Sequence, residues 1–564
     1  TMWPWRDWVV NAFNKNLPFD QFTRWQIAGD LIPDATHEQI LATGFNRNHM
    51  INGEGGRIAE ENRVDYVMDM TETTGTVWMG LTFNCCRCHD HKFDPLTQRD
   101  YYRLSAFFNQ TPVTGGGGNP QTPPILACPE SGQSEQSEKL RSALAAHLTT
   151  LRELERTLFP KEPGSPSPNQ GTILPKEIRE TLNIDPSSRK PDQTDRLMKH
   201  FAASQPDLIK AIKHHAEAKK ASDEHEKSIP KVMVMADLPK PRQTFILDRG
   251  LYTAPKDEVE PGVPASLPAL PDGPSPNRLA LADWLVSREH PLTARVTVNR
   301  IWQTLFGVGL VRTPEDFGVQ SEFPVHPELL DWLAAEFIGS GWDVKHLLKL
   351  ILTSDTYQRS SAILDPTHLE KDPQNRLLAR GPRFRMPAWM LRDQALAVSG
   401  LLHSQVGGRP VNPYQPAGIW EEATFGNRRY QQSSGPDLHR RSLYTFWRRI
   451  VSPTAFFDSA KRQVCEVKPL RTNTPMHALA TLNDPTFVEA ARALAAWCLS
   501  LPSLEDDARL HALMHRILGR TPHSQEIPVL RDSLAKARRS MQGTPENAAK
   551  LLAIGESRSP DHLN

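Results

Sequence analysis

Apolar residues recur with helical spacing along most of this chain, and with strand spacing only in short stretches. Residues 60–80 show the helical pattern clearly, because their apolar side chains fall on one face of a helix. These side chains are those of Val64, Val67, Met68, Val77 and Trp78. Before them, residues 1–30 are rich in Trp and Phe, which predicts an aromatic core. We therefore expect residues 1–112 to form one helical domain.

Amphipathic stripes return in the C-terminal half. Residues 277–400 contain several of them, and residues 404–475 are irregular and rich in Arg, Tyr and Trp. Asp484 is a suitable N-cap, and Pro485 fits the first helical position after it. Further helices are expected at 485–499, 505–517 and 524–539. We expect residues 276–545 to form a second helical domain.

The segment between these domains has a different pattern. Leucines near heptad spacing predict a long charged helix in its first part, and residues 190–228 predict a second polar helix. Together they predict an antiparallel helical hairpin at 134–228. Short apolar runs bounded by Pro and Gly then predict a small β element at 229–267. The expected fold class is mainly α, with two helical domains joined by a helical-hairpin arm and a small β element.

Charge and hydropathy exclude two classes of partner. The 564 residues include 66 Lys and Arg and 65 Asp and Glu, so the net charge is only +1. Such a balance gives no general basic field for nucleic acid or a membrane surface. No apolar run reaches the roughly 20 residues of a membrane-spanning helix. We expect neither a nucleic-acid partner nor a membrane span.

A cysteine motif carries the clearest chemistry. Cys85, Cys88 and His89 form C-x-x-C-H, the attachment pattern for a c-type haem. Positions i, i+3 and i+4 share one face of a helical turn, so two thiols can bond to the porphyrin edge beside one imidazole. That imidazole is the usual proximal ligand of haem iron. The sequence therefore predicts covalent haem c, with His89 as the metal ligand.

Two other interpretations of the motif remain open. One is a zinc or iron site with Cys and His ligands, although no second C-x-x-C pair accompanies the first. The other is a pair of structural cysteines beside a surface histidine. The pairing of Cys86, Cys128, Cys465 and Cys498 in disulfides is also left open by the sequence.

Several nearby residues are candidates for further roles at this site. His49 lies in a glycine-rich polar loop and is our candidate for the second axial metal ligand or a distal-pocket residue, with Met50 as the alternative ligand. A loop histidine whose ring only hydrogen-bonds to the backbone is the structural alternative. His91 follows too closely on His89 to reach the opposite face of the same iron. We therefore expect His91 and Asp94 to act in acid–base catalysis or in positioning. A solvated loop that only orients His89 is the alternative.

Arginines and aromatic residues cluster in the C-terminal domain. Guanidinium groups beside aromatic faces suit sulfated or carboxylated glycans, or a haem propionate. Arg471 is the best single candidate for the propionate, because a turn ended by proline fixes its direction. Structural ion pairs are the alternative. The cluster comprises Arg428, Arg429, Arg440, Arg441, Arg448, Arg449, Arg462 and Arg471, with Tyr430, Tyr444 and Trp447.

Longer motifs point to a family. In the N-terminal part they are the stretches from Ala42 to Asn52, from Glu72 to Thr82 and from Cys85 to Pro95. In the C-terminal part they are the stretches from Asn299 to Gln303, His326 to Leu333, Arg471 to Pro475 and Leu482 to Ala490. With these motifs the chain resembles the secreted planctomycete cytochrome-associated proteins, which combine two adjacent domains of unknown function.

The resemblance implies export to the periplasm or beyond, and haem redox chemistry near polysaccharide and sulfatase genes. It also implies a partner, either a separate redox cytochrome or an upstream cytochrome domain of the same chain. The chain begins without a signal-peptide pattern, so we expect an internal fragment of an exported protein. Cys86 departs from the family, which usually has a small residue there.

Two classes of function follow from these observations. The first is an exported c-type haem protein, a redox enzyme or electron-transfer component that acts with polysaccharide degradation. The second is a non-redox glycan-binding or scaffold protein that contains a structural haem or a Cys/His metal site. An open axial position with substrate-dependent turnover would distinguish a haem-dependent oxidoreductase from an inert six-coordinate protein.

Overall fold

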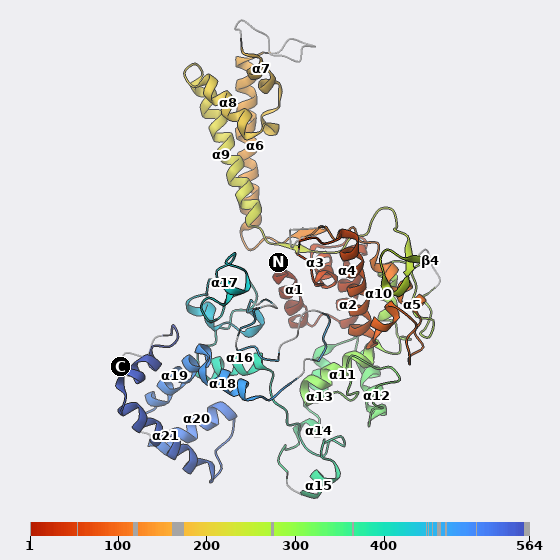
Figure 1. Cartoon of the computed structure of the whole chain (residues 1–564), viewed down its shortest axis with the longest axis vertical. Coiled ribbons are helices and arrows are strands. Elements are labelled where there is room, and N and C mark those ends of the chain that lie inside the picture. The colour runs from red at the N-terminus through yellow and green to blue at the C-terminus, as the bar shows by residue number, and fades with distance from the viewer. Residues whose placement is uncertain are drawn as a thin grey trace. The chain divides into compact units, whose positions relative to one another are not determined.

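The computed structural model describes residues 2–53, 55–116, 122–160, 174–271, 276–363, 366–446, 448, 451–453, 455–458, 464–468, 471–502 and 505–557. Within these residues the protein has twenty-two α-helices and two small two-stranded sheets (Figure 1). The prediction of a mainly helical fold with only small β elements is confirmed.

The chain divides into two compact units. One is Ile125–Met233, called the arm from here on, and the other combines Met2–Pro124 with Val234–Asn564. The arm is built around two long helices that pack along each other, α6 (Gln133–Leu158) and α9 (Pro206–Ser228). Residues 190–228 are not one helix, because Pro206 starts α9 after α8 has ended.

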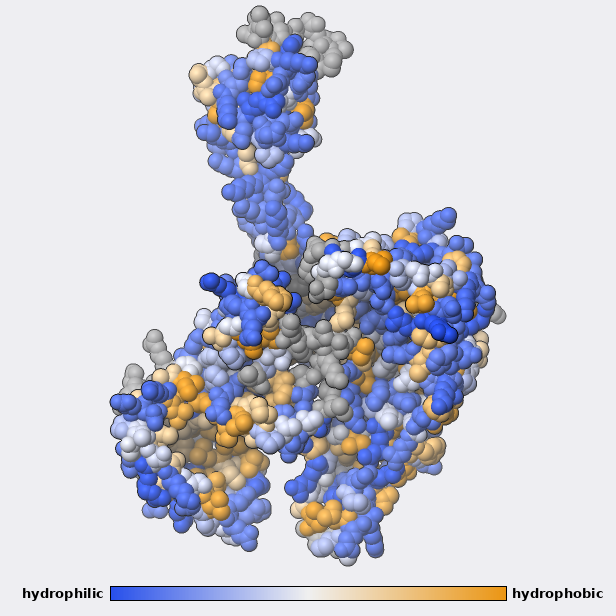
Figure 2. All heavy atoms as spheres, in the orientation of Figure 1, coloured by the Kyte–Doolittle hydropathy of each residue, from blue (hydrophilic) through white to orange (hydrophobic). Residues whose placement is uncertain are grey.

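The arm has its own core and a polar surface. Two shorter helices, α7 (Lys176–Asn183) and α8 (Pro191–Phe201), complete it. The buried apolar residues come from all four helices, and hydrophilic residues dominate its outer surface (Figure 2). The core includes Leu151, Ile178, Leu182, Leu197, Phe201, Leu208 and Ile212. An ion pair between Arg189 and Glu155, both largely buried, adds to this packing.

Five helices form the N-terminal part of the other unit. Aromatic packing holds the first two together, since the Trp8 and Phe22 rings stack with centroids 5.3 Å apart. Thr36 and Thr97 cap the starts of α3 and α5 with capping boxes. The helices are α1 (Trp3–Asn14), α2 (Phe19–Ala28), α3 (His37–Ala42), α4 (Ala59–Thr74) and α5 (Gln98–Phe108).

The strands pair over very different sequence distances. β3 (Thr244–Leu247) pairs antiparallel with β4 (Pro255–Val259), which is local. β1 (Ile125–Ala127) pairs antiparallel with β2 (Lys231–Met233) at the two ends of the arm. The β structure expected within 229–267 is therefore shared with the segment that begins the arm.

Seven helices follow the β element. The apolar faces of α11, α12 and α13 meet in a second core that includes Val298, Trp302, Leu333, Phe337 and Leu347. The helices are α10 (Arg278–Leu285), α11 (Thr293–Phe306), α12 (Pro327–Gly339), α13 (Val344–Leu352), α14 (Asp355–Gln358), α15 (Pro366–Lys371) and α16 (Ala388–Ser399).

The C-terminal part is helical after an irregular stretch. The Asp484 carboxylate accepts from the Thr486 amide at 2.9 Å and Pro485 begins α19, as the sequence predicts. The residues after Gly543 include helix α22. The helices are α17 (Ile419–Ala423), α18 (Pro475–Asn483), α19 (Pro485–Ser500), α20 (Asp506–Leu518), α21 (Glu526–Gln542) and α22 (Pro545–Leu552).

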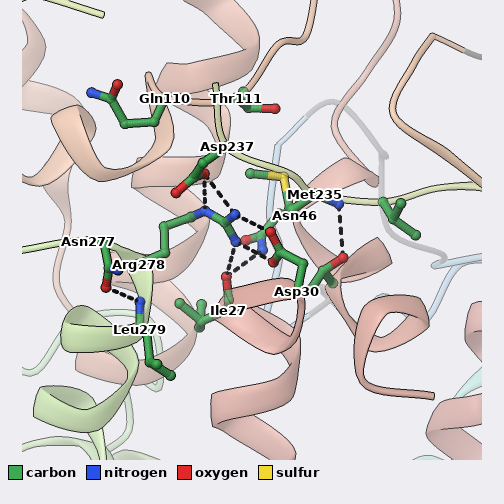
Figure 3. A network of polar contacts seen from close by, with 12 residues as sticks. Ile27, Asp30, Asn46, Gln110, Thr111, Met235, Asp237, Asn277, Arg278 and Leu279 are labelled. Atoms are coloured by element: carbon green, nitrogen blue, oxygen red, sulfur yellow. Dashed lines mark hydrogen bonds and ion pairs between the residues drawn. The ribbon is translucent and has the colours of Figure 1, made fainter. Parts of the chain in front are cut away.

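A buried arginine ties α10 to the N-terminal helices. The Arg278 guanidinium is fully buried and lies between the carboxylates of Asp30, at 2.6 Å, and Asp237, at 2.8 Å (Figure 3). It also donates to the Ile27 carbonyl at 2.8 Å. Burial alone would lower the pKa of Arg278, but the two carboxylates outweigh it and raise the pKa.

Among the described residues, no helix combines the length and apolar character that a bilayer crossing requires.

Candidate functional site

The C-x-x-C-H motif occupies a single helical turn. Residues Phe83–Arg87 form the 3₁₀ helix η4, and Cys88 caps it. The amides of Cys88 and His89 both donate to the Cys85 carbonyl, at 3.2 and 3.3 Å. Cys85, Cys88 and His89 are all exposed. The turn therefore presents two thiols and one imidazole to solvent, within the spacing that the sequence predicts.

Helix α4 precedes this turn in the chain and contacts its first residue, Phe83, through the segment Gly75–Met79. After Thr74 the helix widens into a π-turn, Gly75–Met79, and the Phe83 ring packs directly on Gly75. A Cβ at position 75 would lie 2.3 Å from that ring, so only glycine permits the contact. The buried Phe83 side chain thus fixes the start of η4 against α4.

The rest of the turn is held by hydrogen bonds from three directions. Arg87 pairs with Asp65 of α4 at 2.5 Å, and its carbonyl accepts from the Tyr102 hydroxyl of α5 at 2.8 Å. The Cys88 thiol donates to the Arg249 carbonyl at 3.3 Å. These contacts orient the motif from α4, α5 and the β3–β4 connection.

The His89 imidazole has a defined tautomer. Its Nδ1 lies 2.6 Å from the Asp90 carbonyl oxygen, so Nδ1 carries the proton that this bond requires. In the neutral ring the lone pair is then on Nε2, which has no hydrogen-bond partner among the described residues, and the ring is exposed. A metal-ligating histidine commonly donates its other N–H to a backbone carbonyl or a carboxylate in this way.

Cys86 faces the opposite side of the turn. Its side chain is fully buried, and its thiol donates weakly to the Leu96 carbonyl at 3.6 Å. Burial raises the pKa of Cys86 to about 12, so the thiol stays protonated at neutral pH. The extra cysteine of this chain is therefore separated from the two exposed thiols. All six cysteines are free.

His91 and Asp94 lie together, with Nδ1 of His91 3.4 Å from a carboxylate oxygen of Asp94. Nδ1 accepts from the amides of Phe93 and Asp94, at 3.3 and 2.8 Å, and Nε2 lies 3.3 Å from the Thr82 hydroxyl. Both ring nitrogens of His91 thus have partners within the protein. Asp94 accepts from the Val319 amide at 2.7 Å and connects this loop to the C-terminal part.

His49 lies in the loop after α3 and is buried. Its ring stacks on Tyr66 of α4 with centroids 4.2 Å apart, and Nδ1 donates to the Met50 carbonyl at 3.0 Å. Burial lowers the pKa of His49 to about 4, and its Nε2 is buried without a hydrogen-bond partner among the described residues. Met50 is half exposed. Among the described residues, the hydrogen bond of His49 is to Met50 and its ring contact is to Tyr66, and no such contact to Cys85, Cys88 or His89 is found.

Arg471 lies over a phenylalanine of the C-terminal part. Its guanidinium carbon is 4.9 Å from the centre of the Phe384 ring. Burial, with a smaller contribution from Arg385, lowers the pKa of Arg471. Its position beside a haem propionate remains a prediction.

Two family models match this chain. Residues 1–113 match PSCyt2, described as a protein of unknown function (DUF1549), and residues 277–534 match PSD1, described as a protein of unknown function (DUF1553). No curated protein and no solved structure matches the chain. The C-x-x-C-H turn, His49, His91 and Asp94 all lie in the segment similar to PSCyt2, and Arg471 lies in the segment similar to PSD1.

Within the PSCyt2-like segment, the structure adds two carboxylates that the sequence analysis missed. Burial, together with Glu72, raises the pKa of Asp69 to about 6, and burial also raises the pKa of Glu72. Glu72 accepts from the Tyr101 hydroxyl at 3.0 Å. Asp69 and Glu72 are three residues apart and so lie on one face of α4. This spacing is the only sign of the pair in the sequence. Any amphipathic helix shows the same spacing of carboxylates without having a functional site.

The arginine cluster of the PSD1-like segment is mostly engaged in internal contacts. Arg440 is buried and donates to the carbonyls of Gln405 and Arg409, while its guanidinium lies over the Tyr444 ring. Arg441 lies 3.8 Å from Asp393. Trp447, Arg449 and Arg462 fall outside the described residues. For Arg440 and Arg441, these contacts favour a structural role within the protein over binding of a glycan or a haem propionate.

The side chains of the motif suit a metal ion and a haem to different degrees. In the part of the chain that the structure describes, no group of three or more Cys, His, Asp or Glu side chains is arranged to hold one metal ion. The exposed thiols of Cys85 and Cys88 and the free Nε2 of His89 do fit a group that bonds covalently through two thiols and takes one imidazole.

Proposed function

We propose that this chain is an exported c-type haem protein, a redox enzyme or electron-transfer component that acts with polysaccharide degradation. Cys85 and Cys88 hold the haem covalently and His89 is its proximal ligand. The observation that carries the proposal is the turn itself, in which two exposed thiols accompany an imidazole whose Nδ1 donates to the Asp90 carbonyl at 2.6 Å. The resemblance to planctomycete cytochrome-associated proteins supports export, a cytochrome partner and haem redox chemistry.

The surrounding residues have positioning roles in this proposal. The bond from His89 to Asp90 holds the ring in the tautomer that leaves Nε2 as the ligand atom. His91 and Asp94 keep the loop after the motif folded by accepting backbone amides. His49 is neutral at physiological pH, because burial lowers its pKa to about 4, so its Nε2 is competent as a second ligand. When bound, the haem supplies one-electron chemistry.

The test is the covalent bond. The chain is expressed with export to a compartment that attaches haem c, and the purified protein is extracted with acidified organic solvent. We expect about one haem per chain to remain, as measured by intact mass and the pyridine haemochrome spectrum. Cys85→Ala/Cys88→Ala should lose it, whereas Cys86→Ser is the matched control and should retain it, because the buried Cys86 thiol faces away from the exposed pair.

His89→Ala separates attachment from ligation. The two thiols remain in this variant, so haem that attaches should show an altered absorption spectrum because its proximal imidazole is missing. Clean removal of haem from the unaltered chain by extraction, or stoichiometric zinc in its place, would contradict the proposal.

A second candidate is a non-redox glycan-binding or scaffold protein with a structural haem or a Cys/His metal site. The observation in its favour is the set of arginines that line a cavity in the PSD1-like segment. Redox titration distinguishes the candidates, since a redox protein should reduce and reoxidise reversibly. An iron centre that does not change oxidation state would favour the scaffold.

A further inference from the structure

A cavity in the PSD1-like segment has no role in the haem proposal. Its volume is about 400 Å³, within the size range of small-molecule sites. It is bounded by the end of α11, the start of α12 and the loop that leads from α15 to α16. Its apolar wall includes Trp302 and Phe306 of α11, whose rings stack with centroids 4.0 Å apart, and Phe384.

The loop that forms one wall of the cavity is well ordered by its own hydrogen bonds. The buried Asp372 carboxylate accepts from the amides of Arg376 and Leu377, at 2.7 and 2.8 Å. The Asn375 side chain donates to the Arg380 carbonyl at 2.7 Å. Gly381 packs so closely on Arg359 that a Cβ would lie 2.4 Å from its carbonyl oxygen. The side chains of this loop are therefore presented from a fixed backbone.

The lining of the cavity is cationic. Four arginines, Arg312, Arg376, Arg380 and Arg383, line it together with His326, and its described lining includes no carboxylate. Glu322 pairs with Arg376 at 2.6 Å and with Arg312 at 3.4 Å, so two of the four charges are partly compensated.

Arg380 and Arg383 have N–H donors that are available to a ligand. Arg380 donates through NH2 to two main-chain carbonyls, and its NH1 is buried without a hydrogen-bond partner in the described residues. Arg383 is exposed, and no hydrogen bond or ion pair of its side chain is found among the described residues. A buried donor without a partner is energetically costly unless a ligand or water satisfies it.

Neighbouring features extend the same surface. A second cavity of about 340 Å³ shares Ile363 and Arg380 with the first and is also lined by Arg359. Arg471 lies over Phe384, and the Lys468 ammonium donates to the Arg312 carbonyl at 3.1 Å. Positive charge thus surrounds an apolar wall from several segments of the chain.

We propose that this cavity binds an organic oxyanion, a ring-sized molecule with a carboxylate, sulfate or phosphate group. The anionic group pairs with Arg380 and Arg383, since guanidinium groups bind such oxyanions through paired N–H donors. The ring body packs against the apolar wall that includes Phe384. The site depends on the geometry of residues 302–384 alone, so haem attachment can fail while this proposal stands, and the reverse.

The test is isothermal titration calorimetry on the full chain with defined probes. The ring anions are methyl β-glucuronide, galactose 6-sulfate, galactose 6-phosphate and benzoate, which distinguish sugar from aromatic bodies and carboxylate from ester anions. Methyl β-galactoside is the neutral control and sodium sulfate the control without a ring. We expect at least one ring anion to bind tighter than both controls, and its affinity to fall as salt is added.

Two variants should change the affinity for the anion in opposite directions. Arg383→Gln should weaken binding of the best anion about ten-fold or more, the usual loss for a charge-assisted pair. Its exposed position makes misfolding of this variant unexpected. Glu322→Gln removes the carboxylate that competes for Arg312 and Arg376, and should tighten binding by roughly three-fold. Arg539→Gln, an exposed charge on α21, should leave the affinity unchanged.

Three results would overturn the proposal. They are equal binding of the neutral galactoside, ring anions that bind no tighter than sulfate alone, and an Arg383→Gln affinity equal to that of the unaltered chain.

Discussion

Three histidines of the PSCyt2-like segment differ in which ring nitrogen carries the proton. In His49 and His89 it is Nδ1, because each Nδ1 faces a carbonyl oxygen. In His91 the situation is reversed, since Nδ1 accepts two backbone amides. The first two can therefore offer Nε2 to a metal, while His91 has its nitrogens engaged by the loop.

The sequence could identify these residues but not their roles. Spacing placed Cys85, Cys88 and His89 on one turn, because the relation is local and a helical turn is the same in any context. The stacking of His49 on Tyr66 joins segments from different parts of the fold, and no sequence pattern specifies it. The same holds for Asp69 and Glu72, whose raised pKa values come from burial.

Glu489 of α19 is a buried carboxylate that binds the segment after α22. Its side chain accepts from His439 at 3.0 Å, from the Tyr414 hydroxyl at 3.0 Å and from the Ser557 amide at 2.5 Å. Burial alone would raise the pKa of Glu489, but the bonds from His439 and Ser557 outweigh it and lower the pKa to about 2.

Glu489→Gln should therefore show a pH-dependent loss of stability. The folded-state pKa is depressed from 4.5 to about 2, so the stabilisation is fully present above pH 4.5 and is lost as pH falls toward 2. At pH 7 we expect the variant to unfold with a free energy lower by roughly 2–3 kcal/mol. Denaturant unfolding between pH 7 and pH 3.5, followed by circular dichroism, measures the difference.

Glu422→Gln serves as the control, because Glu422 is exposed on α17. Its effect should stay within about 0.5 kcal/mol at every pH. A difference between Glu489→Gln and the unaltered chain that is constant from pH 7 to pH 3.5 would contradict the linkage.

The local pattern of the sequence predicted where α6 and α19 form, but it did not predict which strands pair. The heptad leucines correctly predicted α6, and Asp484 with Pro485 correctly predicted the start of α19. In contrast, Lys231 near the last residue of the arm pairs with Ala127 near its first residue. A three-residue strand carries no information about a partner so distant in sequence, because alternation specifies a face and not a neighbour.

A close approach between two loops fixes the motif loop to the PSD1-like segment. The Asp94 carboxylate accepts from the Val319 amide, and Gly318 lies directly against it. A Cβ at Gly318 would be 2.3 Å and 2.4 Å from the two carboxylate oxygens. The contact also includes a hydrogen bond from the Phe317 amide to the Gly80 carbonyl at 2.7 Å.

Gly318→Ala should accordingly destabilise the protein. The added methyl group cannot be accommodated without moving Asp94, which is buried, and such overpacking costs about 1–3 kcal/mol. The midpoint of thermal unfolding should fall, as measured by differential scanning fluorimetry.

Gly339→Ala is the matched control. A Cβ at Gly339 meets no atom within 4 Å, at the end of α12, so this change should be neutral or slightly stabilising. Equal midpoints for the two alanine variants would show that the loops are not closely packed against each other.

At the scale of the whole molecule, α2 and α10 connect the two segments that the family models match. Two ion pairs join these regions. Arg24 and Asp283 meet at 2.6 Å with partly exposed side chains, whereas Arg278 pairs with Asp30 in a buried position. Nothing in the sequence distinguishes Arg278 from the many other arginines, because its burial depends on how distant segments pack together.

The difference in burial gives the last prediction. Arg278→Leu leaves the Asp30 and Asp237 carboxylates without their partner, and breaking a buried pair costs about 3–5 kcal/mol. Arg24→Ala removes a partly exposed pair between α2 and α10 and should cost less than about 1 kcal/mol. Urea unfolding of both variants, monitored by tryptophan fluorescence, measures the two losses. If Arg278→Leu were as stable as Arg24→Ala, the buried network would not hold α10 against the N-terminal helices. If it instead produced a separate early transition, the two matched segments would unfold independently rather than as one cooperative unit.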